Sequence, residues 1–274
     1  MNRFSLANTL SRFFDIRPGE ARRVGVMVSL LFFILAANNV IKVVRDSLFL
    51  SRFPISDLAY VYLLAAVIAG VIISGYTRYT VRMPLYRFIL VSNAFIISNV
   101  ILFWFLIVFF NLSWAIYAFY IWAAIVGVLA VAQFWTFVGS IFTSRDAKRL
   151  FGIFSAGGSL GAIVGAFASG WVVNLFVGTD ELFWLMGALF AGALGVVWLA
   201  GSELSELPAA ALTEVPTSRE TDVSQQGSAL GAIRSSRYLQ WIACAIFVSV
   251  GVSTLIDFEF KAPAKRAFPS VGGL

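Results

Sequence analysis

The chain has 274 residues, of which 60% are hydrophobic and 16% aromatic, while only 12% are charged. A soluble domain of ordinary composition has about 25% charged residues, so this composition is that of an integral membrane protein. The net charge of +6 therefore points to loops on the cytoplasmic side of a membrane and not to a nucleic-acid surface. Histidine is absent and Cys244 is the only cysteine, which excludes an internal disulfide, a zinc cluster and His-based catalysis. We expect no enzyme activity, no cofactor and no metal.

Seven segments are apolar enough to cross the hydrocarbon core, which takes about 20 residues. They lie near 24–46, 57–76, 87–110, 113–139, 150–177, 182–200 and 238–256. The first follows an Arg-rich tail, residues 1–23, but it is too long for the core of a cleaved signal peptide and leads into Asn and Lys. We interpret it as a retained membrane helix. Pro54, Ser56 and Asp57 predict the break and cap before the second helix, and Asn111 a tight joint before the fourth.

The distribution of Lys and Arg predicts the orientation. With the N-terminus inside, 14 of the 20 Lys and Arg residues fall on the same side of the membrane and 6 on the other. Cytoplasmic loops are enriched in Lys and Arg, so we expect a cytoplasmic N-terminus. The other side has its cations in two places, directly after the first helix and after the seventh.

A change of composition divides the chain. Residues 201–237 are rich in Ser, Thr, Glu, Ala, Gly and Pro, which cannot bury a core, and they predict a flexible cytoplasmic linker. The linker would separate a six-helix half, 24–200, from the seventh helix and the start of a second half, 238–274. Six helices, a long inner loop and a further helix are typical of a two-half transporter. We expect the chain to stop one helix into its second half; a complete seven-helix protein is the alternative.

The end of the first helix has a polar face. At about 100° per residue, five polar residues fall within an arc of about 120°: Asn38, Asn39, Lys42, Arg45 and Asp46. A charge at the centre of a membrane helix costs roughly 2.5 to 3.5 kcal/mol, which favours a cationic lining of a central cavity. Alternatively, Lys42 and Arg45 reach outward to the headgroups. The periodicity leaves both interpretations open.

The fifth helix has a row of small residues and a charged start. Gly157, Gly161 and Gly165 recur every fourth residue, a spacing that lets a neighbouring helix approach closely, so we predict helix packing. Asp146 at the start of this helix suits its positive N-terminal end. The nearby Lys148 can bind anionic headgroups.

Three motifs in this order resemble the ATP:ADP antiporter (nucleotide transporter) family of plastids and intracellular bacteria. Family members end helix one with a basic residue, two intervening residues and Lys-Asp-Thr/Ser-Leu; here Lys42 is the basic residue, followed by Arg45, Asp46 and SL. The family's Phe-Trp-x-Phe pattern is matched by FWTF at 134–137. Its acid-Ala-Lys-Arg-aromatic stretch is matched by DAKRLF at 146–151. Beyond the seventh helix, FEFKAPAKRAFPS resembles a further family segment and puts Lys261 in register.

The resemblance implies an all-α polytopic membrane protein with a major-facilitator-like frame, located in a bacterial inner membrane. It implies a carrier that exchanges nucleotides of the ATP/ADP type, or related organic anions, by alternating access. Arg45 would bind phosphate oxygens, which suits guanidinium geometry, with Asn39 and Lys42 beside it and Asp46 holding the cations in place. Asp146 and Lys148 would act as a gate or binding pair at the inner mouth.

Two other functions remain open at this point. One is a major-facilitator-like transporter of a non-nucleotide solute. The other is a membrane protein that does not transport, produced from a truncated gene. The expected partners are the lipid bilayer and an anionic small molecule, with no nucleic acid, and the sequence does not indicate an oligomeric state.

Overall fold

The computed structural model describes residues 20–79, 85–176, 180–204 and 236–267. The described residues are helical apart from short joints, and the chain divides into two units, residues 1–208 and 209–274. The predicted tail up to residue 19, most of the predicted linker and the end of the chain lie outside the described residues. Each unit is considered by itself below.

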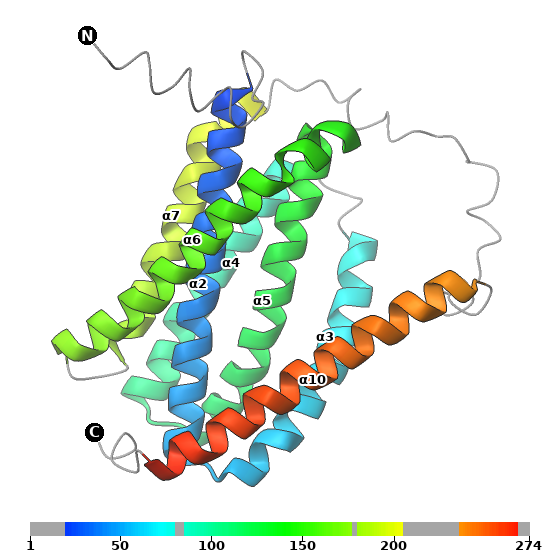
Figure 1. The fold of residues 1–274 in the computed structure, drawn as a ribbon. Helices are drawn as coiled ribbons and strands as arrows, with labels where there is room; N and C mark the ends of the chain where they lie inside the picture. Colours follow the sequence, from blue (N-terminus) through cyan, green and yellow to red (C-terminus); the bar gives the residue numbers. More distant parts are fainter. Residues whose placement is uncertain (1–19, 80–84, 177–179, 205–235, 268–274) are drawn as a thin grey trace. The chain divides into compact units, whose positions relative to one another are not determined.

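All seven predicted helices are confirmed, and each is long and apolar enough to cross a membrane. The first unit contains six of them (Figure 1): α2 (Ala21–Arg52), α3 (Ile55–Tyr79), α4 (Leu85–Trp104), α5 (Ser113–Ile141), α6 (Ser144–Phe176) and α7 (Glu181–Leu204). The second unit contains α10 (Arg237–Ala267). A π-helical segment, Phe105–Phe109, extends α4.

Helix α2 ends six residues beyond its predicted end. The Phe53 N–H still donates to the Phe49 carbonyl at 2.9 Å, and the helix stops only before Pro54, whose ring disfavours helical backbone in the residue before it. Helix α3 then begins at Ile55, and the Asp57 N–H donates to the Pro54 carbonyl at 3.2 Å. Asp57 thus lies inside the first turn, and its prediction as a cap together with Ser56 is wrong.

Asn111 forms the tight joint predicted between the third and fourth spans. Its φ of 53° is left-handed, a conformation that Asn tolerates better than most residues. The turn brings the Leu112 N–H to the Leu106 carbonyl at 3.0 Å, which caps the π-helical segment. The chain can therefore reverse within three residues.

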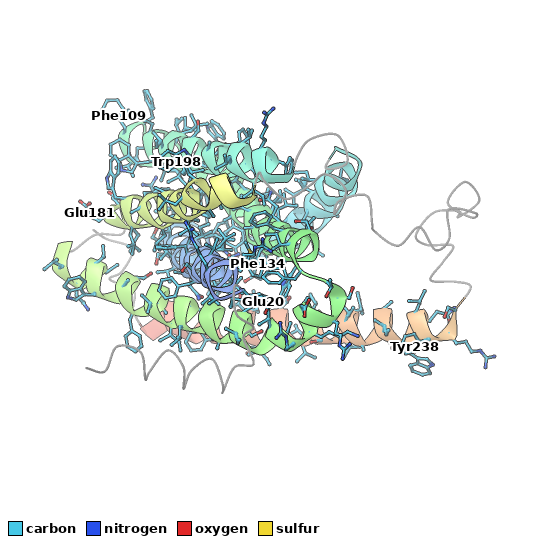
Figure 2. The ribbon with its side chains drawn as sticks, turned by 90° about the horizontal axis from the view of Figure 1, so that it is seen from above. Glu20, Phe109, Phe134, Glu181, Trp198 and Tyr238 are labelled. Carbon is cyan, nitrogen blue, oxygen red and sulfur yellow. The ribbon has the colours of Figure 1, made fainter. Side chains whose placement is uncertain are left out.

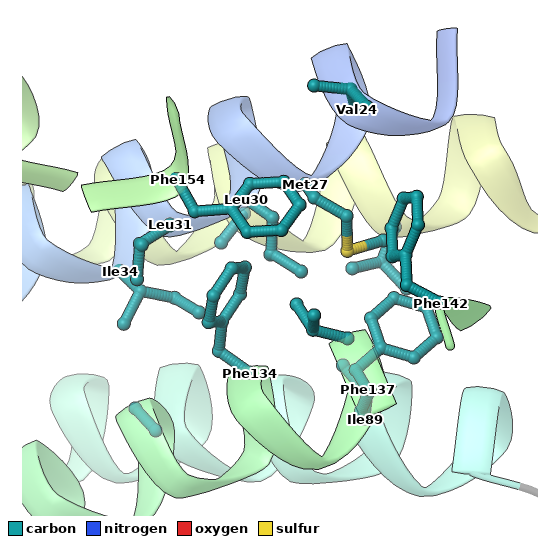
Figure 3. Packing of buried hydrophobic residues seen from close by; sticks show 14 of the residues in the cluster. Val24, Met27, Leu30, Leu31, Ile34, Ile89, Phe134, Phe137, Phe142 and Phe154 are labelled. Atoms are coloured by element: carbon teal, nitrogen blue, oxygen red, sulfur yellow. The ribbon is translucent and has the colours of Figure 1, made fainter. Parts of the chain in front are cut away.

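Helix α2 is the central helix of the first unit, packed by α5, α6 and α7 (Figure 2). Toward its N-terminal end, residues of α2 such as Met27 and Leu30 belong to one apolar cluster (Figure 3). The cluster also contains Phe134 of α5, Phe154 of α6 and Phe142 of the joint between these two helices. The outer helices expose large apolar side chains, including Trp171, Trp184 and Trp198. An apolar exterior of this extent is what a bilayer requires.

Candidate functional site

Helices α2 and α6 run in the same direction, and the row of Gly157, Gly161 and Gly165 meets α2 at a constant offset. Added Cβ atoms at Gly157, Gly161 and Gly165 would meet Val28, Phe32 and Ala36 of α2, and each of these pairs is 129 residues apart. The ion pair between Glu20 and Arg149 has the same separation. An unchanged offset over several turns means that the two helices keep the same register, and the predicted glycine row is the surface of α6 that makes this approach possible.

At the Glu20 end, the structure joins the starts of α2 and α6 by a charge cluster. Arg149 Nη2 donates to Glu20 Oε2 at 2.6 Å and to Asp146 Oδ1 at 3.4 Å. Thr143 caps α6: the Asp146 N–H donates to Thr143 Oγ1 at 3.3 Å, and Thr143 Oγ1 in turn donates to Asp146 Oδ2 at 2.7 Å. Asp146 therefore supports the Thr143 cap from the first turn of α6, while Lys148 is exposed.

The aromatic residues of the FWTF and DAKRLF motifs meet at the joint between α5 and α6. The rings of Trp135 and Phe151 stack with centroids 5.3 Å apart. Phe134 meets Phe154, which follows the second motif by one turn of α6, edge to face at 6.1 Å. These contacts give the aromatic part of both motifs a packing role. The sequence placed Arg149 with Asp146 and Lys148 at the start of this helix but did not indicate Glu20, its partner 129 residues away.

The polar face of α2 lies between its contacts with α5 and with α6. On one side, Asn39 Nδ2 donates to the Ala162 carbonyl of α6 at 3.1 Å. On the other side, Asn38 lies against Gly127 of α5, where an added Cβ would be 2.7 Å from Asn38 Oδ1. Lys42, one turn further along the same face, is exposed and has no carboxylate partner in the part of the chain that the structure describes.

Arg45 is held on two sides. Its Nε donates to Asp46 Oδ1 at 2.9 Å, and its Cζ lies 4.4 Å from the centre of the Tyr120 ring on α5. Its two terminal amino groups, Nη1 and Nη2, find no hydrogen-bond acceptor among the described residues. The Arg45 side chain is only 14% exposed, so these groups form a small, partly shielded donor site.

Tyr120 belongs to an aromatic wall formed by α2, α3 and α5. Its ring centre lies 5.2 Å from that of Phe49 and 5.9 Å from that of Tyr62. Tyr117, one turn earlier on α5, donates its hydroxyl to Asp57 Oδ2 at 3.0 Å. The sequence did not identify Tyr120, because helical periodicity relates residues within α2 and carries no information on its partner 75 positions away.

The remaining predicted site residue belongs to the second unit. Lys261 Nζ pairs with Asp257 Oδ2 at 2.6 Å, one turn earlier on α10. Among the described residues there is no cluster of three His, Cys, Asp or Glu side chains that could hold a metal ion. The chemistry available at the α2 face is thus that of two cations and one carboxylate.

Seven helices of membrane-spanning length and composition define the architecture of a multi-pass α-helical membrane protein. Comparisons of the chain with protein-family models, with curated proteins and with solved structures found no match.

Proposed function

We propose that this protein is a membrane carrier that exchanges nucleotides of the ATP/ADP type, or a related organic anion, by alternating access. One observation carries the proposal. The terminal amino groups of Arg45 form a donor site beside exposed Lys42, on the face of α2 that lies between its contacts with α5 and with α6. Arg45 is the residue that contacts the anion, and Lys42 adds a second positive charge.

The charge balance of this face supports an anionic substrate. Lys42 and Arg45 each carry a positive charge, and Asp46 neutralises one of them. These two turns of α2 therefore have a net charge of +1. An uncompensated charge within a membrane helix is costly and is typical of a substrate or ion pathway. The planar guanidinium matches two oxygens of a phosphate or carboxylate, so its free donors select an oxyanion.

The experiment is exchange of labelled ATP by the protein, expressed from its complete open reading frame, in proteoliposomes loaded with ADP. Arg45→Ala should slow uptake by about tenfold or more, since a hydrogen bond to a charged group contributes about 1.5 to 3 kcal/mol. Arg45→Lys should retain only part of the wild-type uptake rate, because an ammonium group cannot donate two parallel hydrogen bonds to one oxyanion. Arg52→Ala, an exposed cation near the end of the same helix, is the matched control and should leave uptake unchanged. Unchanged uptake in Arg45→Ala would remove the assignment.

Competition distinguishes the substrate classes. Excess unlabelled ADP should inhibit uptake of labelled ATP, while a tricarboxylate should not. Inhibition by the tricarboxylate and not by ADP would favour a non-nucleotide organic anion. Absence of uptake for every labelled anion would leave a membrane protein that does not transport.

A further inference from the structure

The proposed function assigns a role to Arg45 but none to Tyr120, the residue over whose ring the Arg45 guanidinium lies. Tyr120 lies on α5, is 1% exposed and is held by the rings of Phe49 and Tyr62. A fully buried phenol in this position acts as a fixed surface. The 4.4 Å from Arg45 Cζ to the ring centre is within the range of a cation–π contact.

We propose that Tyr120 is the positioning residue of the anion site, and that with Asp46 it directs Arg45 to receive an oxyanion end-on across Nη1 and Nη2. This inference rests on the proposed function for the identity of the ligand. Tyr120 itself does not touch the substrate. It acts through Arg45, by holding the plane of the guanidinium.

The end-on geometry follows from which donors are already occupied. A guanidinium can bind a pair of oxygens through either of two pairs of N–H donors. One pair is on Nε and one Nη, and the other is on the two Nη groups. Asp46 Oδ1 occupies the Nε–H of Arg45 at 2.9 Å, and Arg45 Cζ lies over the Tyr120 ring, 4.4 Å from its centre. The donor pair that remains available in full is the one on Nη1 and Nη2. Phosphate and carboxylate groups both fit it.

The position of the Nη1 and Nη2 donor pair is also fixed relative to Lys42. Arg45 and Lys42 are three residues apart on α2 and therefore adjacent on its surface. With the guanidinium held against α5 by Tyr120, an anion at the Nη edge meets a preorganised donor pair and does not have to order a flexible Arg side chain. Preorganisation of this kind increases affinity by reducing the entropy lost on binding.

The transport test compares three substitutions in α5. Tyr120→Leu, which removes the ring face, should raise the KM for ATP exchange about tenfold while the maximal rate changes less, because a desolvated cation–π contact is about this strong. Tyr120→Phe retains the ring and should stay within about twofold of the wild type. Phe119→Leu is the matched control: Phe119 is equally buried one residue away, but packs on Phe103, Trp122 and Phe183. It should lower thermal stability without raising KM.

A double-mutant cycle separates positioning from general packing. In the Arg45→Lys background, Tyr120→Leu should raise KM by clearly less than in the wild type, since the planar guanidinium that it positions is gone. An equal increase in both backgrounds, or an unchanged KM in Tyr120→Leu alone, would overturn the inference.

A second measurement needs no substrate, so its outcome is independent of the proposed function. Phenylglyoxal modifies arginine side chains, and the modified fraction at each position is read by peptide mass spectrometry. Tyr120→Leu should increase the modification rate of Arg45 severalfold while that of Arg149, which is held by Glu20 and Asp146, stays constant. Equal rates at Arg45 in wild type and Tyr120→Leu would refute the positioning role even if nucleotide exchange is found. If no anion is exchanged but Arg45 responds as expected, the positioning role stands and the substrate assignment fails.

Discussion

Gly161→Ala tests the close contact of α2 and α6 most sharply. An added Cβ at Gly161 would lie 2.7 Å from the Cα of Phe32, where ordinary contacts are 3.4 to 4 Å. Because the obstacle is backbone, the helices must separate by about 1 Å, and a gap of that size removes up to about half of each dispersion contact at the interface. Overpacking typically costs about 1 to 3 kcal/mol. A clash with backbone places the cost in the upper part of that range, and Ala gains up to about 1 kcal/mol in helix propensity, so we expect the free energy of unfolding to fall by about 1 to 2 kcal/mol.

The assay is thermal unfolding of the purified protein in detergent, with two other glycines of α6 as references. Gly157→Ala meets a side-chain atom, Val28 Cγ1 at 2.5 Å, which a rotamer change can move, so it should cost less. Gly170→Ala has nothing within 4 Å and should be neutral or slightly stabilising. If Gly161→Ala unfolds at the same temperature as Gly170→Ala, the register of α2 against α6 is not the one described.

Two further substitutions test helix ends, again by thermal unfolding. Thr143→Ala removes the side chain that caps α6 and should cost about 1 kcal/mol, whereas Ser140→Ala, whose hydroxyl bonds only within α5, should cost less. A loss no greater than that of Ser140→Ala would exclude the Thr143 cap. Asn111→Val should destabilise by about 1 to 2 kcal/mol because a β-branched residue resists the left-handed φ of 53°, while Asn111→Gly should be tolerated. Equal stability of these two variants would contradict the turn.

The seven helices could be predicted from sequence because a span of about 20 apolar residues has few other stable forms. The ends were harder to predict, as α2 shows. Its hydropathy falls at Lys42, and the predicted helix stopped at Asp46, yet the backbone stays helical to Arg52. A polar face changes the environment of a helix without breaking it, whereas Pro54 does break it.

Part of the candidate site could be predicted from the sequence. Periodicity placed Lys42, Arg45 and Asp46 on one face of α2, because that relation lies within a single helix. Tyr120 could not be found in this way, because its contact with Arg45 depends on how α5 packs against α2. Asp146 was expected to act with Lys148, but the structure shows it bonded to Thr143 and Arg149 at the cap of α6.

The most direct test of the central claim is whether water and an anion reach the polar face of α2. Cys244 is the only native cysteine, so a Cys244→Ser background allows single cysteines to be introduced at Lys42 and, as a control, at Leu63, an exposed apolar position on α3. A charged, water-soluble thiol reagent should label Lys42→Cys and not Leu63→Cys, and ATP should slow the labelling of Lys42→Cys. Labelling of Lys42→Cys by an apolar, membrane-soluble reagent alone would place this face in lipid and contradict the account.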